Sequence, residues 1–260
     1  MNTQKICGVP FKGFTLVVDP LDNDTIFSVV CCSNWLKGSY KNSSIRVPEN
    51  GSGVLDLDSF WNSKEMMEFR ESVANGSYSF CDTKKCLRYA SNDIEPPLDQ
   101  AKDLIAQGIY KMDFSPSYIE VNIDRACNLS CPSCRTNYET ISNPKSYNRL
   151  KSVLSSGVEK ILINASGELF KNQHLLRALN EITKELYPNL KKISIITNGT
   201  LLNKTMWASL SEGFKSLIDM IQVSVDAASE QTYKKIRVGG NFHRLLETLS
   251  IIGTLKKENK

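Results

Sequence analysis

From residue 118 onward, short apolar runs alternate with longer segments in which apolar residues recur every three or four positions. The short runs are typical of buried strands, and the longer spacing is typical of amphipathic helices. The predicted strands cover residues 118–123, 160–164, 192–197 and 220–225, and the predicted helices include 172–186, 204–214 and 241–256. This alternation favours about four βα units around a parallel sheet, too few for a closed eight-stranded barrel.

The first third of the chain has a different pattern. Two runs rich in β-forming residues, 14–19 and 26–32, flank a polar turn. Residues 59–76 are predicted to form one helix that starts near Ser59 and ends at Gly76. These short mixed elements predict a small, cysteine-rich α+β module.

Two consecutive prolines, Pro96 and Pro97, mark the predicted boundary between these two patterns, because prolines interrupt regular structure. We therefore expect three parts: a front module over residues 1–95, a linker and helix over 96–117, and the parallel α/β unit over 118–260.

Composition narrows the functional classes. The net charge is only +4, and the basic residues are scattered, so nucleic-acid binding is not indicated. No apolar run approaches the roughly 20 residues of a membrane-spanning helix, and the first residues lack the layout of a secretion signal. We expect a cytoplasmic protein with no membrane or nucleic-acid partner.

Eight cysteines stand out in such a chain. Structural disulfides are rare in reducing compartments, so metal or redox chemistry is the better interpretation. Three of the cysteines, Cys127, Cys131 and Cys134, follow the first predicted parallel strand. Three thiolates hold three corners of a cubane iron–sulfur cluster and leave one iron open to a cofactor or substrate. Structural zinc is the alternative, but it needs a fourth ligand, and His174 and His243 lie in predicted helices without suitable spacing.

The Cys-x3-Cys-x2-Cys spacing after a parallel strand resembles the signature of the radical S-adenosylmethionine (SAM) superfamily. The next strand ends agree, because residues 166–168 resemble the family's glycine–glutamate motif and residues 197–199 resemble a stretch near the ribose of SAM. Residues 224–227 and 237–240 are similar to segments of the branch with auxiliary clusters. The resemblance implies SAM-positioning roles for Ser166, Gly167, Glu168, Asn198, Ser224, Asp226 and Arg237. Polar residues at strand ends also serve as helix caps, which is the alternative for the last three.

The fold implied by the resemblance is a partial (βα) radical SAM barrel that lacks its later strands. The implied cofactors are a [4Fe-4S] cluster and SAM, which is cleaved to a 5′-deoxyadenosyl radical. The implied partners are an electron donor such as flavodoxin or ferredoxin and a peptide, protein or small-metabolite substrate. No catalytic side chain is assigned. Ser133 departs from the family, which often has an aromatic residue before the third cysteine. A non-catalytic metal-binding fragment and an electron carrier are the alternative functions.

The front cysteines resemble those of SPASM or twitch modules, which carry auxiliary iron–sulfur clusters. By this resemblance Cys7, Cys32, Cys81 and Cys86 hold one auxiliary [4Fe-4S] cluster, with Cys31 as the substitute for Cys32. Zinc bound by the same four thiolates is the alternative. These modules usually follow the radical SAM core in sequence, so a module at the front of this chain departs from the usual domain order of the family.

Overall fold

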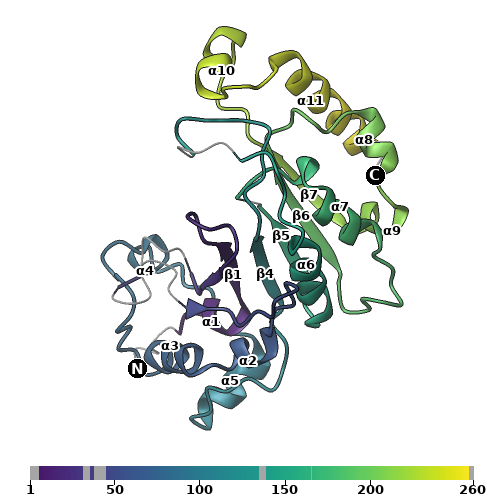
Figure 1. The fold of residues 1–260 in the computed structure, drawn as a ribbon. Coiled ribbons are helices and arrows are strands. Elements are labelled where there is room, and N and C mark those ends of the chain that lie inside the picture. The colour runs from purple at the N-terminus through teal and green to yellow at the C-terminus, as the bar shows by residue number, and fades with distance from the viewer. Residues whose placement is uncertain (1–5, 32–35, 38–44, 135–138, 165, 258–260) are drawn as a thin grey trace.

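The computed structural model describes residues 6–31, 36–37, 45–134, 139–164 and 166–257. A seven-stranded sheet with the order β3-β2-β1-β4-β5-β6-β7 runs through the molecule (Figure 1). The strands are β1 (Gly13–Val18), β2 (Ile26–Val29), β3 (Ile45–Arg46), β4 (Tyr118–Asn122), β5 (Lys160–Ile163), β6 (Lys192–Thr197) and β7 (Ile218–Val223).

Strands β4 to β7 are parallel and lie side by side in chain order. Each lies within two residues of its predicted range, which confirms the βα pattern. Ile119, Ile161 and Ile193 occupy one register across this sheet, and none is exposed to solvent. The mixed α/β fold with a parallel sheet is consistent with a partial radical SAM barrel.

Helices connect the parallel strands and follow the last one. They are α6 (Ser146–Ser155), the 3-10 turn η3 (Leu169–Lys171), α7 (Gln173–Asn180), α8 (Lys204–Ser209), α9 (Glu212–Lys215), α10 (Glu230–Ile236) and α11 (Phe242–Lys257). Two predictions were too long. The helix expected over 172–186 ends at Asn180. The one expected over 204–214 is divided at Leu210, because the Ser211 side chain accepts a hydrogen bond from Phe214 N and starts a new helix.

The front segment contributes further short helices. These are α1 (Val9–Lys12), α2 (Leu57–Trp61), α3 (Lys64–Ala74), α4 (Leu87–Ala90) and α5 (Asp99–Ala106). The single helix predicted over 59–76 was wrong, since α2 and α3 are separate. The Asp56 side chain caps the first and the Ser63 side chain caps the second, and Ser59 lies inside α2.

The front strands belong to the same sheet as the βα units. Strand β1 pairs in parallel with β4, and Gly13 lies opposite Tyr118. A Cβ atom at Gly13 would lie 1.6 Å from the Tyr118 carbonyl oxygen, so only glycine permits this approach. The division into parts at residues 95 and 117 stays a prediction, and hydrogen bonds of one sheet cross it.

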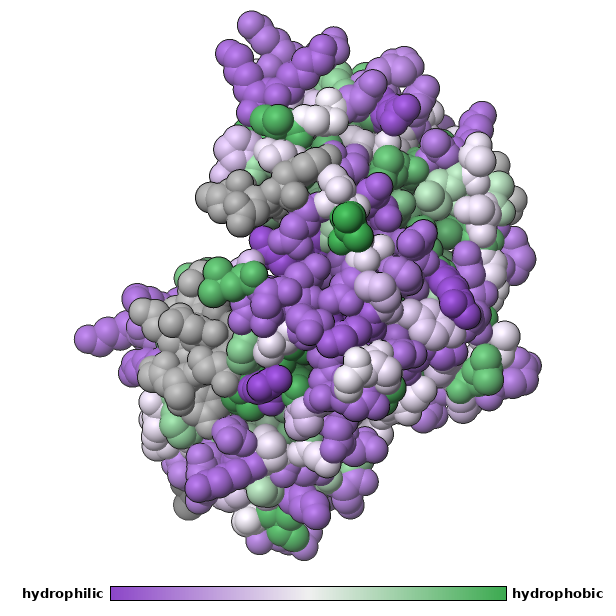
Figure 2. Space-filling view, viewed as in Figure 1, coloured by the Kyte–Doolittle hydropathy of each residue, from purple (hydrophilic) through white to green (hydrophobic). Residues whose placement is uncertain are grey.

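No helix in the described part of the chain is long and apolar enough to cross a membrane. The face shown in Figure 2 is mainly hydrophilic, with hydrophobic residues in separate small groups, and its outline is concave between the front elements and the end that carries α10.

Candidate functional site

A cavity of about 260 Å³ opens at the carboxyl ends of the parallel strands. Active sites of βα proteins are built at this edge, because the strand-to-helix loops converge there. The cavity is lined by the three central cysteines and by six of the predicted SAM-positioning residues: Ser166, Gly167, Glu168, Asn198, Ser224 and Arg237. Asp226 does not line it. The structure thus brings the predicted residues together, and their roles stay predictions.

The loop after β4 presents the cysteines. Cys127 and Cys131 are buried, whereas Cys134 is exposed. The buried Asp124 carboxylate fixes this loop, because it accepts hydrogen bonds from Ala126 N at 2.8 Å, from Asn143 N at 2.8 Å and from the Ser146 hydroxyl at 2.5 Å. Sequence reasoning missed Asp124, although an acidic residue directly after a strand was a signal that could have found it.

Several N–H groups point at the cysteine sulfurs. Leu129 N lies 3.4 Å from Cys127 Sγ, and Asn198 Nδ2 lies 3.8 Å from the same atom. Arg237 Nη1 lies 3.7 Å from Cys131 Sγ. Such donors stabilise negative charge on sulfur, so the loop suits thiolates that bind an iron–sulfur cluster.

Glu168 links the ends of β5 and β6. Its carboxylate is only 2% exposed and accepts hydrogen bonds from the Thr197 hydroxyl at 2.7 Å, Asn198 N at 2.7 Å and Phe170 N at 3.2 Å. Burial raises the pKa of Glu168 above that of an ordinary glutamate, and the three donors oppose this shift. These contacts show that the side chain positions Asn198, and the predicted SAM-positioning role of Glu168 itself stays a prediction.

Asn198 is held on both sides of its amide. Its Oδ1 accepts from Thr200 N at 3.0 Å and from the Thr200 hydroxyl at 2.7 Å, while its Nδ2 donates to Asn128 Oδ1 at 3.0 Å. Asn128 in turn donates to the Thr200 hydroxyl at 2.8 Å. This network ties the end of β6 to the cysteine loop. Asn128 and Thr200 were not predicted, because their contacts join residues about 70 positions apart.

Gly167 lies where the loop after β5 meets the cysteine loop. Glu168 N donates to Ala126 O at 2.8 Å, and a Cβ atom at Gly167 would lie 2.1 Å from that same oxygen. The glycine therefore allows the two loops to touch.

The third part of the rim comes from the end of β7 and the segment after α10. Ser224 N donates to Thr197 O at 2.9 Å. Arg237 forms an ion pair with Asp226, which is half-exposed and has a positive φ of 58°. Asp226 therefore contacts a cavity residue rather than the cavity.

The model for "Radical SAM superfamily" matches residues 121–257, which is more than half of the chain. The chain belongs to the radical SAM superfamily. This confirms the predicted superfamily and the predicted class of enzyme, while the predicted SPASM or twitch module is not shown. The donor set fits the superfamily's cofactors, because three cysteines with N–H donors to two of their sulfurs share one polar cavity.

Curated relatives include a protein named GTP 3′,8-cyclase from Petrotoga mobilis, which is 29% identical over 147 residues, or 54% of this chain and 43% of the relative. A probable GTP 3′,8-cyclase from Methanococcus maripaludis is 33% identical over 127 residues, or 46% of this chain and 40% of the relative. The alignments thus cover less than half of the length of these relatives.

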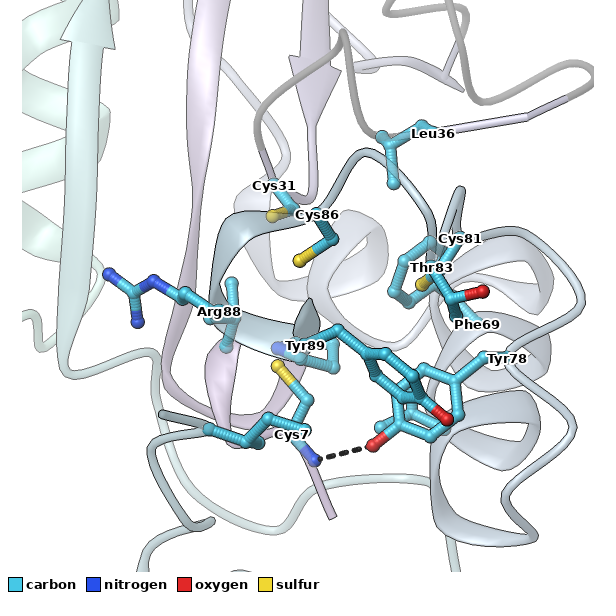
Figure 3. Close-up of a pocket in the computed structure, with 14 residues that line it drawn as sticks. Cys7, Cys31, Leu36, Phe69, Tyr78, Cys81, Thr83, Cys86, Arg88 and Tyr89 are labelled. Atoms are coloured by element: carbon cyan, nitrogen blue, oxygen red, sulfur yellow. Dashed lines mark hydrogen bonds between the residues drawn. The ribbon is translucent and has the colours of Figure 1, made fainter. Parts of the chain in front are cut away.

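A second group of cysteines lies in the front part of this radical SAM chain. Figure 3 shows Cys7, Cys31, Cys81 and Cys86 around one pocket, which is also lined by Tyr78 and Tyr89. The predicted ligand Cys32 lies outside the described residues, and its predicted substitute Cys31 lines the pocket. Burial raises the pKa of Cys81 to about 12 and also raises the pKa of Cys7.

The front pocket is built by segments distant in sequence. Cys31 follows β2, Cys81 precedes α4, and Cys86 is the residue before α4. The Tyr78 hydroxyl accepts a hydrogen bond from Cys7 N at 3.2 Å and fixes the first segment. In the described part of the chain, no three Cys, His, Asp or Glu side chains form a site for a single metal ion.

Proposed function

We propose that this polypeptide cleaves SAM reductively at a [4Fe-4S] cluster held by Cys127, Cys131 and Cys134. The single observation that carries this proposal is the cavity in which the three cysteines face Ser166, Glu168 and Asn198, in a chain of the radical SAM superfamily. When bound, cluster and SAM together supply a 5′-deoxyadenosyl radical that abstracts hydrogen from a substrate.

The chain's own residues position SAM and exclude water in this proposal. Asn198 is fixed by Glu168 and Thr200, so its side chain needs no rearrangement when a ligand binds. Gly167 has no side chain to cover the backbone at the cavity rim, so backbone carbonyl groups there can accept hydrogen bonds from the amino group of SAM. The polar lining suits the charged methionyl end of SAM, and Leu129 and Ile196 add apolar surface.

The electron donor in this proposal is a small redox protein such as flavodoxin or ferredoxin. The exposure of Cys134 supports this, because a protein donor would have access to a cluster on the side of that cysteine. Thiolate ligands persist in a reducing compartment, so we propose that the protein works in the cytoplasm.

The proposed substrate is a small metabolite, with a peptide or protein as the second candidate. Relatives named GTP 3′,8-cyclase act on a nucleotide by their names, which favours the small molecule.

The test is production of 5′-deoxyadenosine. The purified chain is reconstituted with iron and sulfide without oxygen, reduced with dithionite and mixed with SAM, and the product is measured by liquid chromatography with mass spectrometry. We expect 5′-deoxyadenosine from the unmodified chain and none from Cys131→Ala. Cys32→Ala is the matched control and should keep the activity, because Cys32 is not a ligand of either cluster that we propose. Iron bound at the central cysteines without any 5′-deoxyadenosine would favour the metal-binding fragment, and spectra that ignore SAM would favour the electron carrier.

We also propose an auxiliary [4Fe-4S] cluster at Cys7, Cys31, Cys81 and Cys86. The convergence of these four side chains on one pocket supports it, and it assigns Cys31 in place of Cys32. Four thiolates leave no open iron, so this cluster would not cleave SAM.

Metal analysis separates this cluster from zinc. In a variant that lacks the three central cysteines, we expect about four iron and four sulfide per chain. Adding Cys81→Ala should abolish this iron, whereas adding Cys32→Ala should not. One zinc per chain in place of iron, or loss of iron with Cys32→Ala but not with Cys31→Ala, would contradict the assignment.

A further inference from the structure

Arg237 contacts a cysteine that the proposed function assigns to the cluster. Its Nη1 lies 3.7 Å from Cys131 Sγ, and its Nη2 forms an ion pair with Asp226. Its Nε is buried in the cavity rim and has no hydrogen-bond partner among the described residues. The guanidinium therefore lies between a sulfur atom and a carboxylate, and its Nε–H donates to none of the described residues.

The backbone around Arg237 fixes the guanidinium relative to the cysteine loop. Arg237 N donates to Tyr233 O at 2.7 Å, and Gly240 N donates to Arg237 O at 2.8 Å. Ser130 N donates to Val238 O at 2.9 Å and so joins this segment to the residue next to Cys131. The completely buried Tyr233 packs beneath, against Phe242. The distance from Arg237 to Cys131 thus depends on packed backbone rather than on a flexible surface loop.

Asp226 holds the other side of the guanidinium. It follows β7 in a left-handed backbone conformation, with φ at 58°, which Asp tolerates better than most residues. Its side chain is 51% exposed, whereas that of Arg237 is 16% exposed. Water screens the carboxylate more than it screens the buried sulfur, so positive charge remains effective at Cys131.

We propose that Arg237 raises the reduction potential of the central cluster by donating a charge-assisted hydrogen bond to Cys131, and that Asp226 positions it. This inference rests on the proposed cluster. When an external reductant adds one electron, no bond breaks, and the negative charge on the cluster and its thiolates increases. A cationic donor at a thiolate stabilises that added charge and favours the reduced state.

The test is a potentiometric titration of the reconstituted chain, followed by electron paramagnetic resonance in the absence of SAM. This readout is independent of turnover. For Arg237→Gln we expect the ratio of reduced to oxidised cluster at a fixed potential to fall about tenfold. For a one-electron couple this equals a midpoint about 59 mV lower. Arg237→Lys keeps the charge but loses the planar guanidinium. Its midpoint should lie between those of the unmodified chain and Arg237→Gln.

Lys235→Gln is the matched control, because it removes the same charge from an exposed position in α10, two residues before Arg237. Its midpoint should remain that of the unmodified chain. An equal shift in this variant would show that only net charge acts and would overturn the proposed contact.

Asp226→Asn tests the positioning role. Two effects oppose each other in this variant, since loss of the negative charge raises the midpoint and loss of the anchor lowers it. We expect a shift in the same direction as Arg237→Gln but smaller. A higher midpoint would overturn the positioning role and leave Asp226 as a simple counter-charge.

The failure of this inference differs from the failure of the proposed function. If the unmodified chain binds no cluster at the central cysteines, both are overturned. If the cluster binds and Arg237→Gln and Arg237→Lys both leave its midpoint unchanged, only the inference is overturned. Weaker SAM binding in these variants with an unchanged midpoint would assign the guanidinium to the carboxylate of SAM instead.

Discussion

Replacement of Glu168 by glutamine tests how the ends of β5 and β6 are joined. In the structure, Oε1 accepts from Thr197 and Phe170, and Oε2 accepts from Asn198 N at 2.7 Å. Glutamine keeps the shape and one acceptor, but its amino group would face a donor. One buried hydrogen bond to a charged group is lost and a backbone N–H is left unpaired. We expect the free energy of unfolding to fall by about 2 to 3 kcal/mol.

Urea denaturation of the metal-free chain, followed by circular dichroism, measures this change. Glu168→Ala should cost more, about 3 to 5 kcal/mol, because all three donors lose their partner. Glu159→Gln is the control. It removes the exposed partner of Lys191 and should change the stability by less than about 1 kcal/mol. A Glu168→Gln variant as stable as the unmodified chain would refute the proposed linkage between the strand ends.

Two further outcomes follow from the same structure. Arg70→Ala should cost about 3 to 5 kcal/mol in urea denaturation, because it leaves three backbone carbonyls without their donor, while exposed Arg46→Ala should cost little. Gly167→Ala should weaken SAM binding at least tenfold in calorimetry, since its Cβ would displace the cysteine loop, and unchanged affinity would show that the two loops separate freely.

The parallel half of the fold could be predicted because its signal is local. Each of β4 to β7 is a short, mainly apolar run, and polar residues just after the strands mark the edge where the cavity lies. The cysteine spacing places three predicted ligands on one loop, so no long-range contact was needed to propose them. The helix over 59–76 failed because Ser63 begins a new helix inside an otherwise continuous apolar pattern.

Contacts between segments that lie far apart in the sequence could not be predicted from its local patterns. The parallel pairing of β1 with β4 joins residues about 105 positions apart, and its only local trace is Gly13. The ion pair of Arg237 with Asp226, and its contact with Cys131, depend on how α10 returns to the cysteine loop. Arg70 is an extreme case, since charged side chains are rarely buried and its acceptors are three backbone carbonyls and the Asn62 side chain.

The central claim is that one iron of a three-cysteine cluster is open and binds SAM directly. Electron–nuclear double resonance of the reduced, reconstituted chain tests it, with SAM labelled with ¹⁵N in its amino group and ¹⁷O in its carboxylate. The account predicts hyperfine coupling from both labels, and loss of both in Cys131→Ala. A reduced cluster at the central cysteines that shows no coupling to either label, or zinc bound by these cysteines, would contradict it.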